Sequence, residues 1–153
     1  LDNKVVQTLA RAFVELGYSA WRPNFRGVGD SEGRHDEGGG EVDDLAAVLT
    51  HLKAVNPVLA GFSFGAAMTA KLGARVKSER MVLVGAAVTN FELPPVPAGT
   101  LLIHGELDVT IPLTAVLQWA QPQGLQVLVV PGADHFFHRK LPELKAIVTG
   151  YWR

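Results

Sequence analysis

The sequence has 153 residues, enough for one domain; 48% are hydrophobic and 19% charged, as in an ordinary globular protein. A formal net charge of −1 gives no electrostatic reason to expect nucleic acid or an anionic membrane as partner, so we expect a small-molecule substrate. With no cysteine, disulfides, thiolate catalysis and cysteine-bound metals are excluded. The five histidines show no paired metal-ligand spacing, and we expect neither a metal nor another cofactor.

No stretch has the length and apolarity of a membrane span, and residues 1–4 do not begin a signal or transit peptide. A cytoplasmic location is therefore the default expectation. The oligomeric state stays open.

The chain opens on a predicted amphipathic helix. Apolar residues recur at helical spacing over residues 6–16, Asp2 or Asn3 can cap the start, and Gly17 can end the helix. A short strand is predicted next, over residues 18–21.

A polar loop is predicted over residues 24–40, a length that is usually functional or mobile inside a compact domain. Its charges are interpreted as a solvated rim and comprise Arg26, Asp30, Arg34, Asp36 and Glu37. A second amphipathic helix follows, which ends before Pro57 and has its apolar positions at Val42, Leu45, Leu49 and Leu52.

The remaining elements alternate between strand and helix. After a strand that ends near residue 60 and a helix rich in small residues, we predict strands at residues 81–86, 101–105 and 125–130 and helices at 113–120 and 141–152. This alternation predicts an α/β fold, a mostly parallel, doubly wound sheet with helices on both faces. Ligands of such folds lie at the carboxyl ends of the strands.

The sequence Gly61-Phe62-Ser63-Phe64-Gly65 lies between an apolar strand and a helix. This is the arrangement of a nucleophile elbow, a strained turn that holds a serine hydroxyl clear of the backbone. Strand and helix nearly touch there, which explains glycine on both sides. We therefore predict Ser63 as a nucleophile, and the backbone N–H of Phe64, at the helix N-terminus, as one donor of an oxyanion hole.

The same Gly-x-Ser-x-Gly pattern occurs at residues 29–33, around Ser31. No apolar strand leads into it and no helix leads out, so Ser31 is interpreted as a turn residue.

A serine nucleophile needs a base and an orienting acid, each beyond the end of a later strand. Asp108 and His135 occupy such positions, in the order Ser, Asp, His. Glu106 is a rival acid two residues away. The competing histidines are His35, His51, His104 and His138; His51 is predicted within a helix, His104 within a strand and His138 at the start of the last helix.

These segments resemble the α/β-hydrolase superfamily over nearly the whole chain. Residues 24–33 look like the loop after its fourth strand, residues 61–65 like its elbow, and the Asp108 and His135 segments like its acid and histidine turns. Small, lidless bacterial serine hydrolases of the dienelactone-hydrolase-like group are the most similar in pattern, with serine in place of a cysteine nucleophile. The resemblance implies a Ser63–His135–Asp108 triad and ester-type hydrolysis.

Compared with that superfamily, the sequence begins at the first helix. The N-terminal strands and the loop that supplies the second oxyanion donor would lie upstream of Leu1, so we expect residues 1–153 to be a single, N-terminally incomplete domain of a longer natural chain.

The predicted function is hydrolysis of small carboxylic esters, thioesters or lactones through an acyl-enzyme. The stretch between residues 86 and 101 is too short for a lid domain, which favours small soluble substrates. The alternative is a non-catalytic binding or scaffold protein with the same fold.

Overall fold

The computed structural model describes residues 3–22 and 39–152. In chain order the elements are α1 (Lys4–Glu15), α2 (Gly39–His51), β1 (Val58–Phe62), α3 (Phe64–Gly73), β2 (Arg80–Val84), β3 (Leu101–Gly105), α4 (Leu113–Ala120), the 3₁₀ turn η1 (Gln121–Gln123), β4 (Val127–Val130) and α5 (Leu141–Trp152). The predicted loop charges, Ser31 and His35 lie outside the described residues.

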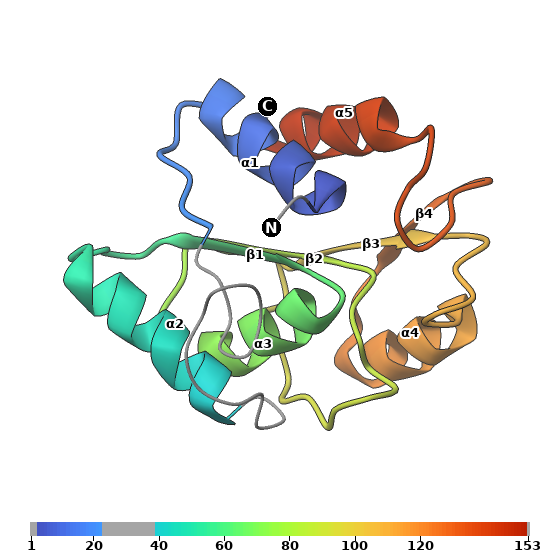
Figure 1. Ribbon diagram of the computed structural model, residues 1–153. Helices are drawn as coiled ribbons and strands as arrows, with labels where there is room; N and C mark the ends of the chain where they lie inside the picture. The colour runs from blue at the N-terminus through green and yellow to red at the C-terminus, as the bar shows by residue number, and fades with distance from the viewer. Residues whose placement is uncertain (1–2, 23–38, 153) are drawn as a thin grey trace.

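The four described strands form one sheet in the order β1-β2-β3-β4, and every neighbouring pair is parallel (Figure 1). Parallel strands place all their carboxyl ends at one edge. The loops that carry Ser63, Asp108 and His135 leave from this edge, after β1, β3 and β4.

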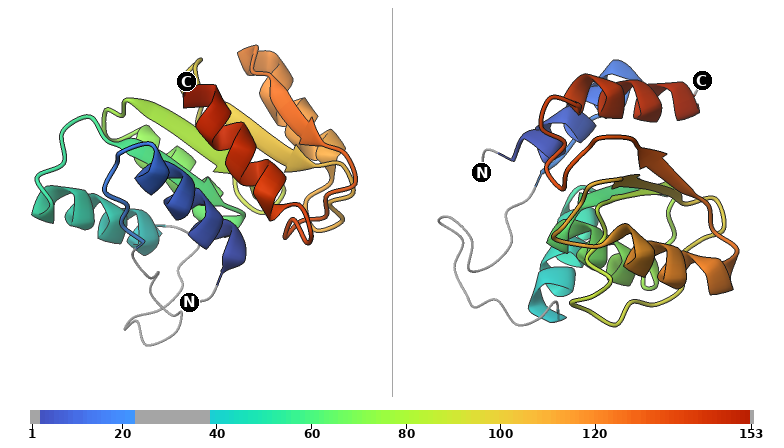
Figure 2. Two further views of the ribbon diagram at one scale, coloured as in Figure 1. Left: turned by 90° about the horizontal axis from the view of Figure 1, so that it is seen from above. Right: turned by 90° about the vertical axis from the view of Figure 1, so that its right-hand side faces the viewer.

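Helices cover both faces of the sheet. Helices α1 and α5 lie side by side on one face, and α2, α3 and α4 lie on the other (Figures 1 and 2). Each face has its own cluster of buried apolar side chains. In β2, residues 81–84 are all buried, because a sheet covered on both faces leaves neither side of a central strand in water. The predicted doubly wound α/β architecture is confirmed.

Helix α1 begins and ends as its sequence predicts. The side chain of Asn3 accepts a hydrogen bond from the Val6 N–H at 3.1 Å, which satisfies one of the helix's unpaired donors. Gly17 follows the helix with φ of +99°, a conformation that glycine adopts without a Cβ penalty.

The predicted strand at residues 18–21 is wrong. Residues 18–22 form no ladder with any strand that the structure describes, and a strand exists only through its partner. Side chains hold the segment instead: the Tyr18 hydroxyl donates to Glu79 at 2.8 Å and accepts from the Trp152 indole N–H at 3.2 Å.

Other differences concern the ends of elements. Helix α2 begins at Gly39, inside the predicted loop, while β4 begins at Val127 rather than at residue 125 and β2 ends two residues early. Gly85 still donates its N–H to the Ile103 carbonyl at 3.0 Å, but its φ of +56° then turns the backbone away from β3, which explains the early end of β2. The turn η1 was not predicted.

Candidate active site

Ser63 occupies a strained turn between β1 and α3. Its φ and ψ of 57° and −117° lie in a region that residues with a side chain rarely adopt. The Ser63 N–H donates to the Val84 carbonyl at 2.9 Å, so the strand pairing continues up to the turn. A Cβ on Gly61 would collide with the Gly65 carbonyl oxygen, which shows why strand and helix can approach only with glycine there.

The strain at Ser63 predicts an unusual stability difference. Ser63→Gly should have a free energy of unfolding about 1 kcal/mol higher than Ser63→Ala, because glycine adopts this backbone conformation without strain. Ser78, which has no positive φ, is the matched control: the Ser78→Gly variant should have a lower free energy of unfolding than the Ser78→Ala variant. Denaturant unfolding of the four variants measures both differences, and a Ser63→Gly variant less stable than Ser63→Ala would contradict the assignment of strain.

Asp108 lies in the turn after β3 and is only 5% exposed. Its Oδ1 accepts the backbone N–H groups of Thr110, at 2.9 Å, and Ile111, at 2.8 Å. These two bonds fix the carboxylate plane and direct Oδ2 towards His135, whose Nδ1 lies 2.6 Å away.

His135 connects the acid to the serine. The residue is only 4% exposed, and its Nε2 lies 2.9 Å from Ser63 Oγ. A carboxylate oxygen only accepts, so Nδ1 carries the proton and donates a hydrogen bond to Asp108 Oδ2. In the neutral ring Nε2 is then left as the acceptor for the Ser63 hydroxyl. The structure thus brings the three predicted residues together in a chain of two hydrogen bonds.

The turn that carries His135 starts at β4, the far edge of the sheet from β1. It folds back over the end of β3, where the Leu107 N–H donates to the Ala133 carbonyl at 2.9 Å. Glycines allow this close passage: a Cβ on Gly105 would lie 2.5 Å from that carbonyl oxygen, and one on Gly85 would lie 3.2 Å from His135 Cε1. The contact of Gly85 with His135 was not predicted, because nothing in the sequence around Gly85 indicates which distant loop lies over it.

Gly105→Ala is therefore expected to displace the His135 turn, because the added Cβ would meet backbone atoms, which cannot rotate away. Overpacking of this kind typically lowers the free energy of unfolding by about 1–3 kcal/mol. The control is Gly150→Ala in α5, where a Cβ meets nothing within 4 Å and should stabilise the helix by about 0.5–1 kcal/mol. Equal unfolding free energies for the two variants would contradict this account of Gly105.

The rivals of Asp108 and His135 have other contacts. Glu106 accepts the Gly132 N–H at 2.9 Å. His138 is 75% exposed, and its Nδ1 lies 2.5 Å from Asp134 Oδ2. Burial raises the pKa of Asp134, but the hydrogen bonds from the His138 side chain and backbone outweigh it, and the pKa is lowered. Both pairs lie outside the Ser63–His135–Asp108 chain.

Aromatic side chains surround the His135 ring. The ring centroid of Phe62 lies 4.9 Å from it, and Phe136 packs edge-on at 5.0 Å. Phe136 is half exposed, whereas Phe137 is completely buried in the core beside α5. Phe62 and Phe136 thus form an apolar wall beside the His135 ring.

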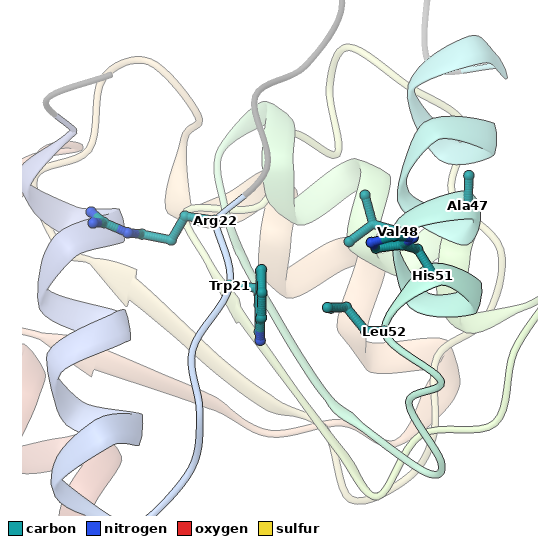
Figure 3. A pocket seen from close by; sticks show the side chains of 6 residues that line it. All are labelled: Trp21, Arg22, Ala47, Val48, His51 and Leu52. Carbon is teal, nitrogen blue, oxygen red and sulfur yellow. The ribbon is translucent and has the colours of Figure 1, made fainter.

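A hollow of about 410 Å³ lies elsewhere, between residues 21–22 and helix α2 (Figure 3). It is lined by Trp21, Arg22, Ala47, Val48, His51 and Leu52, and by none of the three residues of the hydrogen-bonded chain. Among residues 3–22 and 39–152, no three metal-ligating side chains are grouped so as to hold an ion. Within the same ranges no helix has the length and apolarity needed to cross a membrane.

Comparisons with known proteins identify the family of the chain. A family model described as serine aminopeptidase, S33, matches residues 3–125, a stretch that includes Ser63 and Asp108 and ends before His135. RP471 of Rickettsia prowazekii is 31% identical in an alignment 170 residues long, which covers 99% of this chain and 71% of that protein.

Two solved structures are similar in both sequence and fold. XC6422 of Xanthomonas campestris, described as an α/β serine hydrolase without lid, is 36% identical with a TM-score of 0.90, over 98% of this chain and 72% of its own. An α/β serine hydrolase homologue from Coxiella burnetii is 36% identical with a TM-score of 0.86, over 99% and 77%. The family model and these two structures support a hydrolytic role. The chain belongs to the α/β-hydrolase superfamily, in the family described as serine aminopeptidase, S33.

Proposed function

We propose that this protein is a serine hydrolase that cleaves small carboxylic esters, thioesters or lactones. The observation that carries the proposal is the continuous chain of hydrogen bonds from Asp108 through His135 to Ser63, at 2.6 and 2.9 Å. Ser63 is its nucleophile, His135 its general base and Asp108 the acid that orients the imidazole. The strained turn at Ser63 supports the role, since strain concentrates at functional sites.

The reaction runs in two halves. Ser63 Oγ attacks the carbonyl carbon and its proton passes to His135 Nε2, while the Phe64 N–H, in the first residue of α3, donates to the developing oxyanion. The tetrahedral intermediate collapses, the protonated His135 gives its proton to the leaving oxygen or sulfur, and an acyl-enzyme remains. Water then attacks the acyl carbon while His135 takes its proton, and as the acid is released the proton passes from His135 to Ser63 Oγ, which restores the hydroxyl.

Two features support a small substrate. Residues 85–100, between β2 and β3, contain no helix or strand that could form a lid. The side chains in ring contact with His135 are Phe62 and Phe136, and Phe136 is half exposed, so they offer apolar contact to an acyl or alcohol group. We therefore propose uncharged, short-chain substrates. Because the formal net charge is −1, we propose neither nucleic acid nor a membrane as partner.

The test is reaction with a fluorophosphonate probe, followed by mass-spectrometric mapping of the labelled residue and a panel of short-chain aryl esters, thioesters, lactones and aminoacyl anilides. We expect a label on Ser63, none in Ser63→Ala, and turnover of the ester-type substrates. His138→Gln is the control and should label at the wild-type rate, because His138 contacts Asp134 on the surface.

Each contrary result points to another function. Protein that neither labels nor hydrolyses any substrate would favour a non-catalytic binding or scaffold protein. Hydrolysis of the anilides alone would replace the ester class by a peptidase.

A further inference from the structure

His104 is a completely buried polar side chain in β3 to which the mechanism above gives no role. Its Nε2 lies 2.7 Å from the Ile111 carbonyl oxygen and 3.4 Å from Asp108 Oδ2. Since a carbonyl oxygen only accepts, Nε2 carries a proton and donates a hydrogen bond to Ile111, while Asp108 Oδ2 lies close to the same nitrogen.

The other ring nitrogen settles how His104 acts. Nδ1 is buried and has no hydrogen-bond partner in the part of the chain that the structure describes. A second N–H at that position would be a buried donor with no described acceptor, and a buried donor left unsatisfied is costly. His104 therefore acts through the single N–H of Nε2, as a hydrogen-bond donor to the Ile111 carbonyl.

Ile111 is the residue through which this donor reaches the site. Its N–H donates to Asp108 Oδ1 at 2.8 Å, while its carbonyl accepts from His104. The two bonds hold the residue from both sides and close the turn of residues 105–112 around the carboxylate. The remaining oxygen, Oδ2, is the one that faces His135, and it also lies 3.4 Å from His104 Nε2.

We propose that His104 is a positioning residue for the Asp108–His135 pair. It fixes the Asp108 turn through Ile111 and places the positive end of its N–H dipole near Oδ2, so that this oxygen stays directed at His135 Nδ1. The inference rests on the proposed function, because it assigns a role within the same reaction.

The test compares His104→Gln with His104→Phe and His104→Asn. The glutamine amide nitrogen can reach the place of Nε2, whereas phenylalanine has no donor and the asparagine amide is too short. We expect kcat to fall about tenfold to a hundredfold in the Phe and Asn variants with KM within about twofold, and kcat to be largely retained in the Gln variant. The low-field proton resonance of the His135–Asp108 hydrogen bond should persist with Gln and disappear with Phe and Asn.

Ile103→Ala is the control for a purely structural loss. Ile103 is buried in the same strand but belongs to the cluster on the α1 and α5 face, so this variant should melt at a lower temperature and keep its kcat. Equal kcat in the Gln and Asn variants, or losses in all variants that simply follow the melting temperature, would overturn the inference. If wild-type protein neither labels nor hydrolyses ester, the proposed function fails, and the proton resonance alone still decides whether His104 positions Asp108.

Discussion

Ser63→Ala is expected to lower kcat for a short-chain aryl ester by a factor on the order of 10⁴–10⁶, with KM little changed. The Ser63 hydroxyl is the group that His135 Nε2 contacts, and without it no acyl-enzyme can form. Removal of the nucleophile alone costs a serine hydrolase nearly the whole contribution of its triad. The fold should persist, because the turn is held by the Ser63 backbone N–H, which alanine keeps.

The matched control is Ser31→Ala, since Ser31 stands in the second Gly-x-Ser-x-Gly sequence. It should turn over ester at close to the wild-type rate. Kinetics with both variants, checked for folding by circular dichroism, decide between the two serines. If Ser63→Ala retained wild-type turnover, the nucleophile would have to be sought elsewhere.

The elbow could be predicted because its requirements are local. An apolar strand, a serine between two glycines and a helix rich in small residues follow one another along the chain, and the φ of 57° at Ser63 confirms the strained turn. The order and turn positions of Asp108 and His135 were likewise readable, since a parallel sheet brings the ends of its strands to one edge.

The features that could not be predicted depend on contacts between distant segments. Residues 18–21 were predicted as a short strand, but no described strand pairs with them. Neither the approach of Gly85 to His135 nor that of Gly105 to Ala133 can be read from one segment, because each glycine is explained by a loop far along the chain. His104 was assigned correctly to a strand, yet its contact with Ile111 required the turn of Asp108 to be in place.

Asp108→Asn is expected to reduce kcat about 10⁴-fold, as the loss of the orienting carboxylate does in a Ser-His-Asp site. The two backbone N–H groups of Thr110 and Ile111 now point at Oδ1, so the amide oxygen must take that place. The amide NH₂ then faces His135, and Nδ1 has to accept where it now donates. In that tautomer the proton sits on Nε2, which can no longer accept the Ser63 proton.

The same reasoning predicts that stability changes little, since the amide oxygen of the variant would keep both backbone bonds now made by Oδ1. Glu106→Gln is the matched control: its amide oxygen can still accept the Gly132 N–H, and no atom of Glu106 takes part in the chain to Ser63. It should retain near wild-type kcat and unfold at the same denaturant concentration. Steady-state kinetics and denaturant unfolding of the two variants test the assignment, and a loss in Glu106→Gln as large as in Asp108→Asn would show that the acid of this site is not Asp108 alone.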